Sequence, residues 1–303
     1  MVPADTSQPS ASSDKSSKTL KLLGKPVAEA IQSDVTDKIQ QFAKKYSRSP
    51  KLAVILVGED GASAVYVRSK GKACEKVGIK SETIRLPSTV SEAELINKVS
   101  QLNADAEVDG ILIQLPLPKQ INAEKVLNLV DPMKDVDAFT TASSGEIFKD
   151  QSLVYPCTPS GVMRMLAFYK IAVAGKNVVV IGRSQIVGKP MAMLMLKENA
   201  TVTVCHSKTE KLENFTRAAD IVVVAAGKRE FLGRSAFSEK SVVIDVGIHG
   251  SGTGGQICGD VKFSELDGYV AAISPVPGGV GPLTIAVLLE NTLKLAEARC
   301  QQL

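Results

Sequence analysis

Short runs of apolar residues alternate with segments of helical periodicity along most of this chain. Residues 52–57, 110–114, 178–181, 221–225 and 242–246 read as apolar strands, with helical patterns at 27–46, 63–77, 91–103 and 191–198. A strand that is apolar at nearly every position is buried on both faces, as in a parallel sheet with helices on each side. The pattern therefore predicts an α/β fold with parallel sheets.

The strand and helix pattern divides into two units, as expected for 303 residues. Residues 19–157 form the predicted N-terminal domain, and a second unit begins at Thr158. Residues 158–282 repeat the rhythm of a Rossmann-like, doubly wound parallel sheet that binds nucleotides. Residues 1–18 are rich in Ser, Pro, Asp and Lys and lack the apolar core of a signal peptide, so we interpret them as a disordered tail.

Eight residues near the C-terminus, Pro275–Pro282, contain three glycines and three prolines. Proline fixes φ and lacks a donor N–H, whereas glycine permits positive φ and the close approach of another group. The segment therefore predicts one fixed loop between a possible strand at 269–273 and a helix from Leu283 to Ala298. Such a loop is either a tight structural turn or part of a binding site, and the segment alone favours neither.

A second glycine-containing turn, Gly182–Pro190, joins the strand at 178–181 to a helix. A turn of this kind presents backbone N–H groups to a phosphate, although the spacing is not that of the GxGxxG fingerprint. The next strand ends in Cys205-His206-Ser207 without the carboxylate expected for NAD. Arg183 and Ser207 suit a ribose 2′-phosphate instead, which favours NADP. The alternative is an ordinary turn with Arg183 facing solvent.

Tyr66 and Lys70 are four residues apart on a predicted helix and share one face with Ser63. A buried lysine whose pKa is lowered can serve as an acid or a base. The alternative is a solvated lysine, and the spacing alone favours it because this helix also carries other basic residues.

Polar side chains also follow the strand at 110–114. Gln114 ends that strand and is followed by Leu115-Pro116-Leu117-Pro118, and Asp135 and Asp137 come next along the chain. Ligands of α/β proteins bind at the carboxyl ends of parallel strands. These side chains either contact a ligand or are satisfied within the protein, and the sequence leaves both readings open.

The composition excludes several classes of protein. A net charge of +4, without a basic stripe and with 4% aromatic residues, argues against nucleic-acid binding. No apolar run reaches membrane-spanning length. Five widely spaced cysteines and two histidines indicate free thiols in a reducing, cytoplasmic compartment rather than disulfides or a metal site.

Nine segments, taken in order, resemble the bifunctional methylenetetrahydrofolate dehydrogenase/cyclohydrolase family. They are Tyr66–Lys70, Asp109–Pro118, Lys134–Asp137, Pro156–Pro159, Gly182–Ser184 with Val187–Gly188, Ala200–Ser207, Asp245–Ile248, Gly259–Val261 and Pro275–Pro282. The resemblance runs from about Leu20 to about Ala296. The proline- and glycine-rich loop and the run from Gln114 to Pro118 are its most specific parts.

The resemblance implies two α/β domains flanking a cleft, with the C-terminal helix, residues 283–303, packing back onto an N-terminal folate-binding catalytic domain. It implies NADP-dependent oxidation of 5,10-methylenetetrahydrofolate to the methenyl form, followed by hydrolysis to 10-formyltetrahydrofolate. A homodimer that uses no metal is expected from the same resemblance.

The resemblance also assigns roles to individual residues. Lys70 is the expected catalytic lysine, with Gln114 as its hydrogen-bond partner and Tyr66 orienting the folate. The expected substrate-binding residues are Ser63, Tyr66, Lys70, Gln114, Leu115, Asp137, Pro277 and Gly278. The expected cofactor-binding residues are Gly182, Arg183, Ser184, Val187, Gly188, His206, Ser207 and Ile248.

Two departures from the family pattern lie near these residues. Ala138-Phe139-Thr140-Thr141 replaces a common Gly-Phe-His-Pro, and His249 stands where Asn is common. Two other functions stay open: a dehydrogenase without hydrolase activity, and a silent NADP- or folate-binding regulator. The presence of both Lys70 and Gln114 argues against each.

Overall fold

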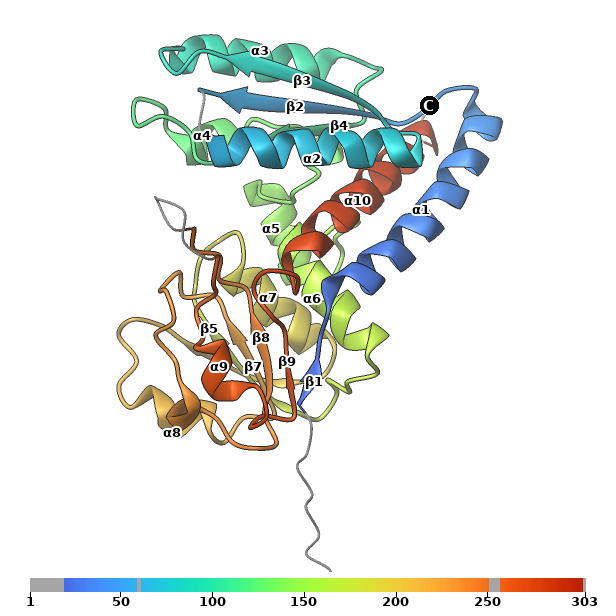
Figure 1. Cartoon of the computed structure of the whole chain (residues 1–303). Coiled ribbons are helices and arrows are strands. Elements are labelled where there is room, and N and C mark those ends of the chain that lie inside the picture. The colour runs from blue at the N-terminus through green and yellow to red at the C-terminus, as the bar shows by residue number, and fades with distance from the viewer. Residues whose placement is uncertain (1–18, 59–60, 251–256, 302–303) are drawn as a thin grey trace, which may run out of the picture.

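The computed structural model describes residues 19–58, 61–250 and 257–301 and contains two parallel sheets (Figure 1). The first sheet has the order β3-β2-β4, with β3 at Lys80–Leu86, β2 at Lys51–Val57 and β4 at Gly110–Ile113. The second has the order β1-β9-β8-β7-β5-β6, formed by Leu20–Lys21, Ala272–Ile273, Val242–Asp245, Ile221–Val224, Asn177–Ile181 and Thr201–Cys205. The predicted α/β fold with parallel sheets is confirmed.

Alternate residues of the central strand β2 serve two separate cores in the first domain. Leu52, Val54 and Leu56 face α1 (Gly24–Tyr46), α2 (Gly61–Val77) and α10 (Gly281–Gln301). Ala53, Ile55 and Val57 face α3 (Glu92–Ala104) and α4 (Ala123–Leu127). Burial on both faces explains why β2 is apolar at six successive positions.

The second sheet is also buried on both faces. Val178 and Val180 of β5 pack against α6 (Cys157–Phe168) and α7 (Gly188–Lys197). Val179 and Ile181 face the core near α8 (Leu212–Thr216), η2 (Arg234–Ala236) and α9 (Phe263–Leu266). The carboxyl ends of these parallel strands form one edge, where ligands of doubly wound sheets bind.

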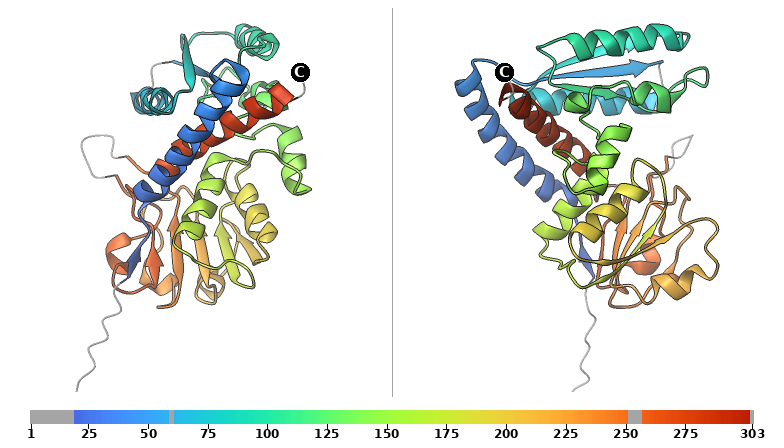
Figure 2. Two further views of the ribbon diagram at one scale, coloured as in Figure 1. Left: turned by 90° about the vertical axis from the view of Figure 1, so that its right-hand side faces the viewer. Right: turned by 180° about the vertical axis from the view of Figure 1, so that it is seen from behind.

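Helix α10 joins the two domains. Leu283 and Ala286, in its first turns, belong to the core of the second domain, and Leu289 and Leu293 belong to that of the first. Figures 1 and 2 show α1 and α10 side by side between the two sheets. This agrees with the expectation that the C-terminal helix returns to the first domain.

One boundary of the predicted domains is wrong. Residues 20–21 were expected in the N-terminal domain, but they form β1 at the edge of the second sheet, where Leu22 N–H donates to Ile273 O at 2.8 Å. A strand of two residues has no periodicity to detect, and its partner lies about 250 residues away. The sequence also gave no sign of α4, η1 (Pro132–Lys134), α5 (Thr141–Phe148), α8, η2 or α9.

None of the helices in the described ranges is both long and apolar enough to cross a membrane. The same ranges contain no cluster of three or more His, Cys, Asp or Glu side chains that is suited to a metal ion.

Candidate active site

Lys70 is the one buried lysine of the basic helix α2, with 7% of the residue exposed. Its Nζ donates to Gln114 Oε1 at 3.0 Å and lies 4.6 Å from the centroid of the Tyr66 ring. Arg68 and Lys72, on the same helix, are exposed. The structure therefore supports the polar cluster over the solvated lysine that spacing alone favoured.

Gln114 is held at the end of β4 by its own backbone and amide. Its N–H donates to Ile55 O at 2.9 Å, which continues the sheet ladder, and its Nε2 donates to Leu115 O at 2.7 Å. With the amide nitrogen engaged, Oε1 is directed to Lys70. The peptide bond that follows, Leu115–Pro116, is cis.

Asp137 faces Lys70 across a small cavity of about 130 Å³ that both residues line. The Cys157 thiol donates a hydrogen bond to Asp137 Oδ1, with an Sγ···O distance of 3.4 Å. Asp135 is instead satisfied within the protein, since its Oδ2 accepts from Thr140 N–H and Ser143 Oγ, each at 2.8 Å. Of the two aspartates that the sequence singled out, only Asp137 is available to a ligand here.

Burial shifts the protonation equilibria of this cavity. Desolvation lowers the pKa of Lys70, while the charge of Asp137 opposes that change. Desolvation also raises the pKa of Asp137, against the effect of Lys70, and raises the pKa of Tyr66 to about 12. The amine of Lys70 thus gives up its proton more readily than an exposed lysine does.

The loop Pro275–Pro282 lines a second cavity of about 570 Å³. Gly278 has a φ of +100°, and its carbonyl accepts from Gly24 N–H at 2.8 Å. A Cβ on Gly24 would lie 1.8 Å from Gly279 O, so the start of α1 fixes the loop by direct backbone contact. The loop follows β9 and contains a second cis peptide bond, Val276–Pro277.

This loop cavity and the Lys70 cavity are contiguous. Both are lined by Tyr66, Thr158, Val187 and Thr284. The Tyr66 hydroxyl is hydrogen-bonded to Thr284 Oγ1, which links the catalytic helix to the start of α10. The loop is therefore one wall of a cleft between the two domains, a position that favours a binding element over a purely structural turn.

The turn between β5 and α7 is closely packed. Gly182 has a φ of +132°, and a Cβ there would lie 2.3 Å from Ala225 O. A Cβ on Gly188 would lie 2.3 Å from Gly182 O. Ser184 Oγ accepts from the N–H groups of Val187 and Gly188, both at 3.2 Å. The two glycines, six positions apart, therefore allow the turn to pack closely against the end of β7 and the start of α7.

A pocket of about 370 Å³ lies beside this turn at the carboxyl ends of the strands. Arg183, His206, Ser207 and Lys228 line it, and no Asp or Glu is among its lining residues. Two cations and a hydroxyl suit a phosphate on the ribose, while a carboxylate would repel it. The glycine-lined turn, the cations and the missing carboxylate all fit NADP.

The turn also connects the pockets. Arg183 and Ser184 line the pocket beside the strands, and Val187 lines the two contiguous cavities of the cleft. Ile248, a further expected cofactor residue, lines the loop cavity together with Pro277 and Gly278. An extended ligand held by this turn would therefore reach the Lys70 side of the cleft.

Two of the expected substrate residues stand apart from these cavities. Gln114 and Leu115 are not among the residues that line them; Gln114 is hydrogen-bonded to Lys70, and the Leu115 carbonyl accepts from the Gln114 amide. The side chain of Ser63 lies outside the described residues. Its expected role stays a prediction.

Sequence reasoning gave no role to Thr284, Lys228 or Cys157, which the structure places at the site. Lys228 follows the strand Ile221–Val224, so the rule that ligands bind at carboxyl strand ends was the available signal. Thr284 is the second residue of the helix that the sequence predicts from Leu283, and only the three-dimensional contact with Tyr66 reveals it.

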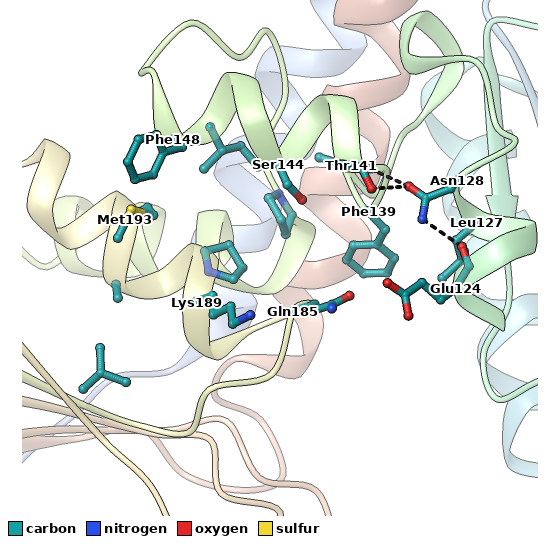
Figure 3. Close-up of a pocket in the computed structure, with 16 residues that line it drawn as sticks. Glu124, Leu127, Asn128, Phe139, Thr141, Ser144, Phe148, Gln185, Lys189 and Met193 are labelled. Carbon is teal, nitrogen blue, oxygen red and sulfur yellow. Dashed lines mark hydrogen bonds between the residues drawn. The ribbon is translucent and has the colours of Figure 1, made fainter.

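A further pocket of about 450 Å³ lies on the other side of Phe139, between α4 and α5 of one domain and α7 of the other. Figure 3 shows Phe139 pointing toward Gln185, with Phe148 and Met193 at the far end. Phe139 also lines the Lys70 cavity. Its side chain therefore separates the catalytic cleft from this further pocket.

Comparison with known proteins agrees with this geometry. Residues 22–137 match the family model "Tetrahydrofolate dehydrogenase/cyclohydrolase, catalytic domain", and residues 156–300 match that of its NAD(P)-binding domain. The chain is 52% identical over 278 residues to the bifunctional protein FolD of Bdellovibrio bacteriovorus, over 92% of this chain and 96% of the relative.

Two solved structures are also similar. The bifunctional enzyme FolD of Campylobacter jejuni has a TM-score of 0.89 and 44% identity, over 93% of this chain and 99% of that one. The methylenetetrahydrofolate dehydrogenase-cyclohydrolase of Trypanosoma brucei, solved with NADP and an inhibitor, has a TM-score of 0.89 and 35% identity. That match covers 94% of this chain and 99% of the other.

Proposed function

The chain belongs to the tetrahydrofolate dehydrogenase/cyclohydrolase family, and on that premise we propose that it catalyses both reactions of the name in a single cleft. It oxidises 5,10-methylenetetrahydrofolate with NADP and then hydrolyses the methenyl product to 10-formyltetrahydrofolate. One observation carries this proposal. Lys70, buried and bonded to Gln114, lines a cavity contiguous with the loop cavity and bordered by the cofactor turn.

NADP fits the turn at Gly182–Gly188 and the pocket beside it. Arg183 and Ser207 would bind the 2′-phosphate, with Lys228 as a second cation and His206 beside them, while Gly182, Ser184 and Gly188 shape the adjoining turn. When bound, NADP supplies the hydride acceptor. The protein would contribute position, because Val187 and Ile248 line the loop cavity in which cofactor and folate would be brought together.

The folate lies in the contiguous cavities. Tyr66 presents its ring to the substrate, Asp137 accepts hydrogen bonds from the pterin, and Pro277 and Gly278 form the opposite wall. Leu115 supports this arrangement through the carbonyl that holds the Gln114 amide. Because the loop is held in place by Gly24, little ordering is needed when the substrate binds.

Lys70 performs the proton transfers of the hydrolysis. Water adds to an amidinium carbon that is already electrophilic, so a positioned amine is sufficient and no metal is needed. Desolvation lowers the pKa of Lys70, which increases the fraction of neutral amine at working pH. Gln114 Oε1 holds the Nζ in one position and stabilises its protonated form.

Two other functions are less well supported. A dehydrogenase without hydrolase activity, or a silent binding protein, has no need for a desolvated lysine with a dedicated amide partner. Both Lys70 and Gln114 are present and bonded to each other.

The proposal is tested by steady-state assays of the purified chain with 5,10-methylenetetrahydrofolate. We expect reduction of NADP in preference to NAD, and decay of the methenyl absorbance to the 10-formyl product. Reduction without accelerated decay would indicate a dehydrogenase alone, and no reduction with either cofactor would overturn the proposal.

We propose further that the chain is a cytoplasmic homodimer. Strand β6 lies at one edge of the second sheet, and its residue Val204 is 41% exposed. Unpaired strand edges tend to pair with another chain. Val204 also lines the pocket of Figure 3, where Phe148 is 76% exposed. The five cysteines are free, as a reducing compartment requires.

A further inference from the structure

Asp260 is a fully buried carboxylate beside the cofactor pocket, and the reactions described above do not use it. Its Oδ2 accepts from the N–H groups of Ala226 at 2.7 Å and Gly227 at 3.0 Å, and its Oδ1 accepts from Lys228 N–H at 3.0 Å. These three residues form the turn after β7. Ala226 and Lys228 of this turn line the pocket that fits the adenosine end of NADP.

His249 reaches the same carboxylate from the other side. Its Nε2 lies 2.7 Å from Asp260 Oδ1, and 20% of its side chain is exposed. Its backbone exchanges hydrogen bonds with Cys258, at 2.8 and 3.2 Å. The neighbours of this backbone pair, Ile248 and Ile257, line the loop cavity of the cleft. Asp260 and His249 therefore connect the walls of both pockets that an extended cofactor would occupy.

The Asp260 carboxylate is closely packed. A Cβ on Gly247 would lie 2.3 Å from Asp260 Oδ1, and one on Gly259 would lie 1.9 Å from the Asp245 carboxylate. Asp245 in turn accepts from Asp260 N–H and Val261 N–H, each at 3.0 Å. No room is left for the carboxylate to move, so a group bonded to it is held in one place.

We propose that His249 is a positioning residue for NADP, which acts by joining the backbone at 248–249 to the 226–228 turn through Asp260. The inference rests on the proposed function, because it takes NADP to be the ligand of this cleft. His249 does not contact the reacting atoms. It sets the separation between the wall at Ile248 and the wall at Lys228, and so sets the affinity for a ligand that touches both.

The hydrogen bond between His249 and Asp260 determines which substitutions of His249 test the proposal. An ionised carboxylate only accepts, so His249 must carry a proton on Nε2. Glutamine can place an amide N–H close to that position, whereas leucine fills similar space without a donor. His249→Gln should therefore keep the connection and His249→Leu should lose it, leaving Asp260 Oδ1 with the bond from Lys228 N–H but without the one from the imidazole.

The test is NADP binding by isothermal titration calorimetry, followed by steady-state kinetics and thermal melting. We expect His249→Leu to weaken NADP binding and raise KM for NADP by about tenfold, with kcat changed by less than about twofold. Hydrolysis of the methenyl substrate without NADP should change by less than about twofold in both variants. His249→Gln should bind NADP within about threefold of wild type.

The outcomes separate this inference from the function on which it rests. Wild-type affinity in His249→Leu would overturn the positioning role. So would equal losses of NADP binding and of hydrolysis in both variants, because these would indicate a general structural defect. A wild-type chain that binds no NADP would overturn the proposed cofactor, and this inference with it.

Discussion

At the scale of single residues, burial decides which of several similar side chains can do chemistry. Lys70 and Lys72 are two positions apart on α2, yet only Lys70 is buried and has a side-chain partner in Gln114. Asp135 and Asp137 differ in the same way, because Asp135 is satisfied by Thr140 and Ser143 while Asp137 lines the cavity. Charge alone predicts neither difference.

Arg183 should determine the choice between NADP and NAD. Arg183→Ala removes a cation from the pocket that fits the 2′-phosphate, so we expect affinity for NADP to fall about thirtyfold and that for NAD to change less than about twofold. Calorimetric titration with each dinucleotide measures this. Arg217→Ala, which removes an exposed arginine elsewhere on the same domain, is the control. Equal losses for both dinucleotides would refute a 2′-phosphate contact.

Asp245 should make stability depend on pH. Burial raises its pKa from 3.8 to about 6, so the folded chain holds this proton more tightly than the unfolded chain does. The stability that Asp245 contributes is therefore present below pH 3.8 and is lost as the pH rises through about 6.

Asp245→Asn does not ionise, so its free energy of unfolding should rise relative to wild type by roughly 2 kcal/mol between about pH 4 and pH 7. Urea unfolding across this range provides the measurement, with the exposed Asp37→Asn as a control. A difference between Asp245→Asn and wild type that is constant with pH would be inconsistent with the raised pKa.

At the scale of elements, close backbone contacts shape the walls of the cleft. The start of α1 supports the Pro275–Pro282 loop through Gly24, and Gly182 and Gly188 bring α7 close to the sheet. Each contact leaves no space for a Cβ. These glycines are thus required by close approach between elements rather than by flexibility.

Gly24→Ala tests the role of that support. The added Cβ would lie 1.8 Å from Gly279 O, so the loop must shift, and we expect KM for the folate to rise about tenfold and Tm to fall by several degrees. Gly145→Ala is the matched control, because nothing lies within 4 Å of its Cβ in helix α5. The control should be neutral or slightly stabilising. An unchanged folate KM in Gly24→Ala would contradict the account of the loop.

At the scale of the whole molecule, the periodic part of the fold could be predicted from the sequence. Strands such as Lys51–Val57 and helices such as Gly188–Lys197 follow from apolar periodicity, and the family resemblance is confirmed. The edge strand Leu20–Lys21 could not be found, because its hydrogen bonds go to a segment about 250 residues away.

The candidate site was predictable to a similar degree. Short motifs identified Lys70, Gln114, Asp137 and the cofactor turn. Contacts made only by folding, such as Tyr66 with Thr284 and His249 with Asp260, needed the structure. In each of these pairs the partners come from different parts of the chain, and no sequence pattern relates one partner to the other.

Assembly should depend on β6. Val204→Glu places a charge on the exposed edge of the sheet and beside the pocket of Figure 3, so we expect it to dissociate a dimer. Sedimentation analysis should show a mass of twice 32.1 kDa for wild type and 32.1 kDa for the variant. A wild-type monomer, or a variant that remains dimeric, would contradict an interface at this edge.

By the proposed function, the buried amine of Lys70 makes this chain a cyclohydrolase as well as a dehydrogenase. The most direct measurement is hydrolysis of 5,10-methenyltetrahydrofolate by Lys70→Met, with Lys72→Met as a matched exposed control on the same helix. We predict that hydrolysis falls more than about 100-fold in Lys70→Met while NADP binding is retained, and that Lys72→Met behaves as wild type. Wild-type hydrolysis in a folded Lys70→Met would show that the lysine does not carry the reaction.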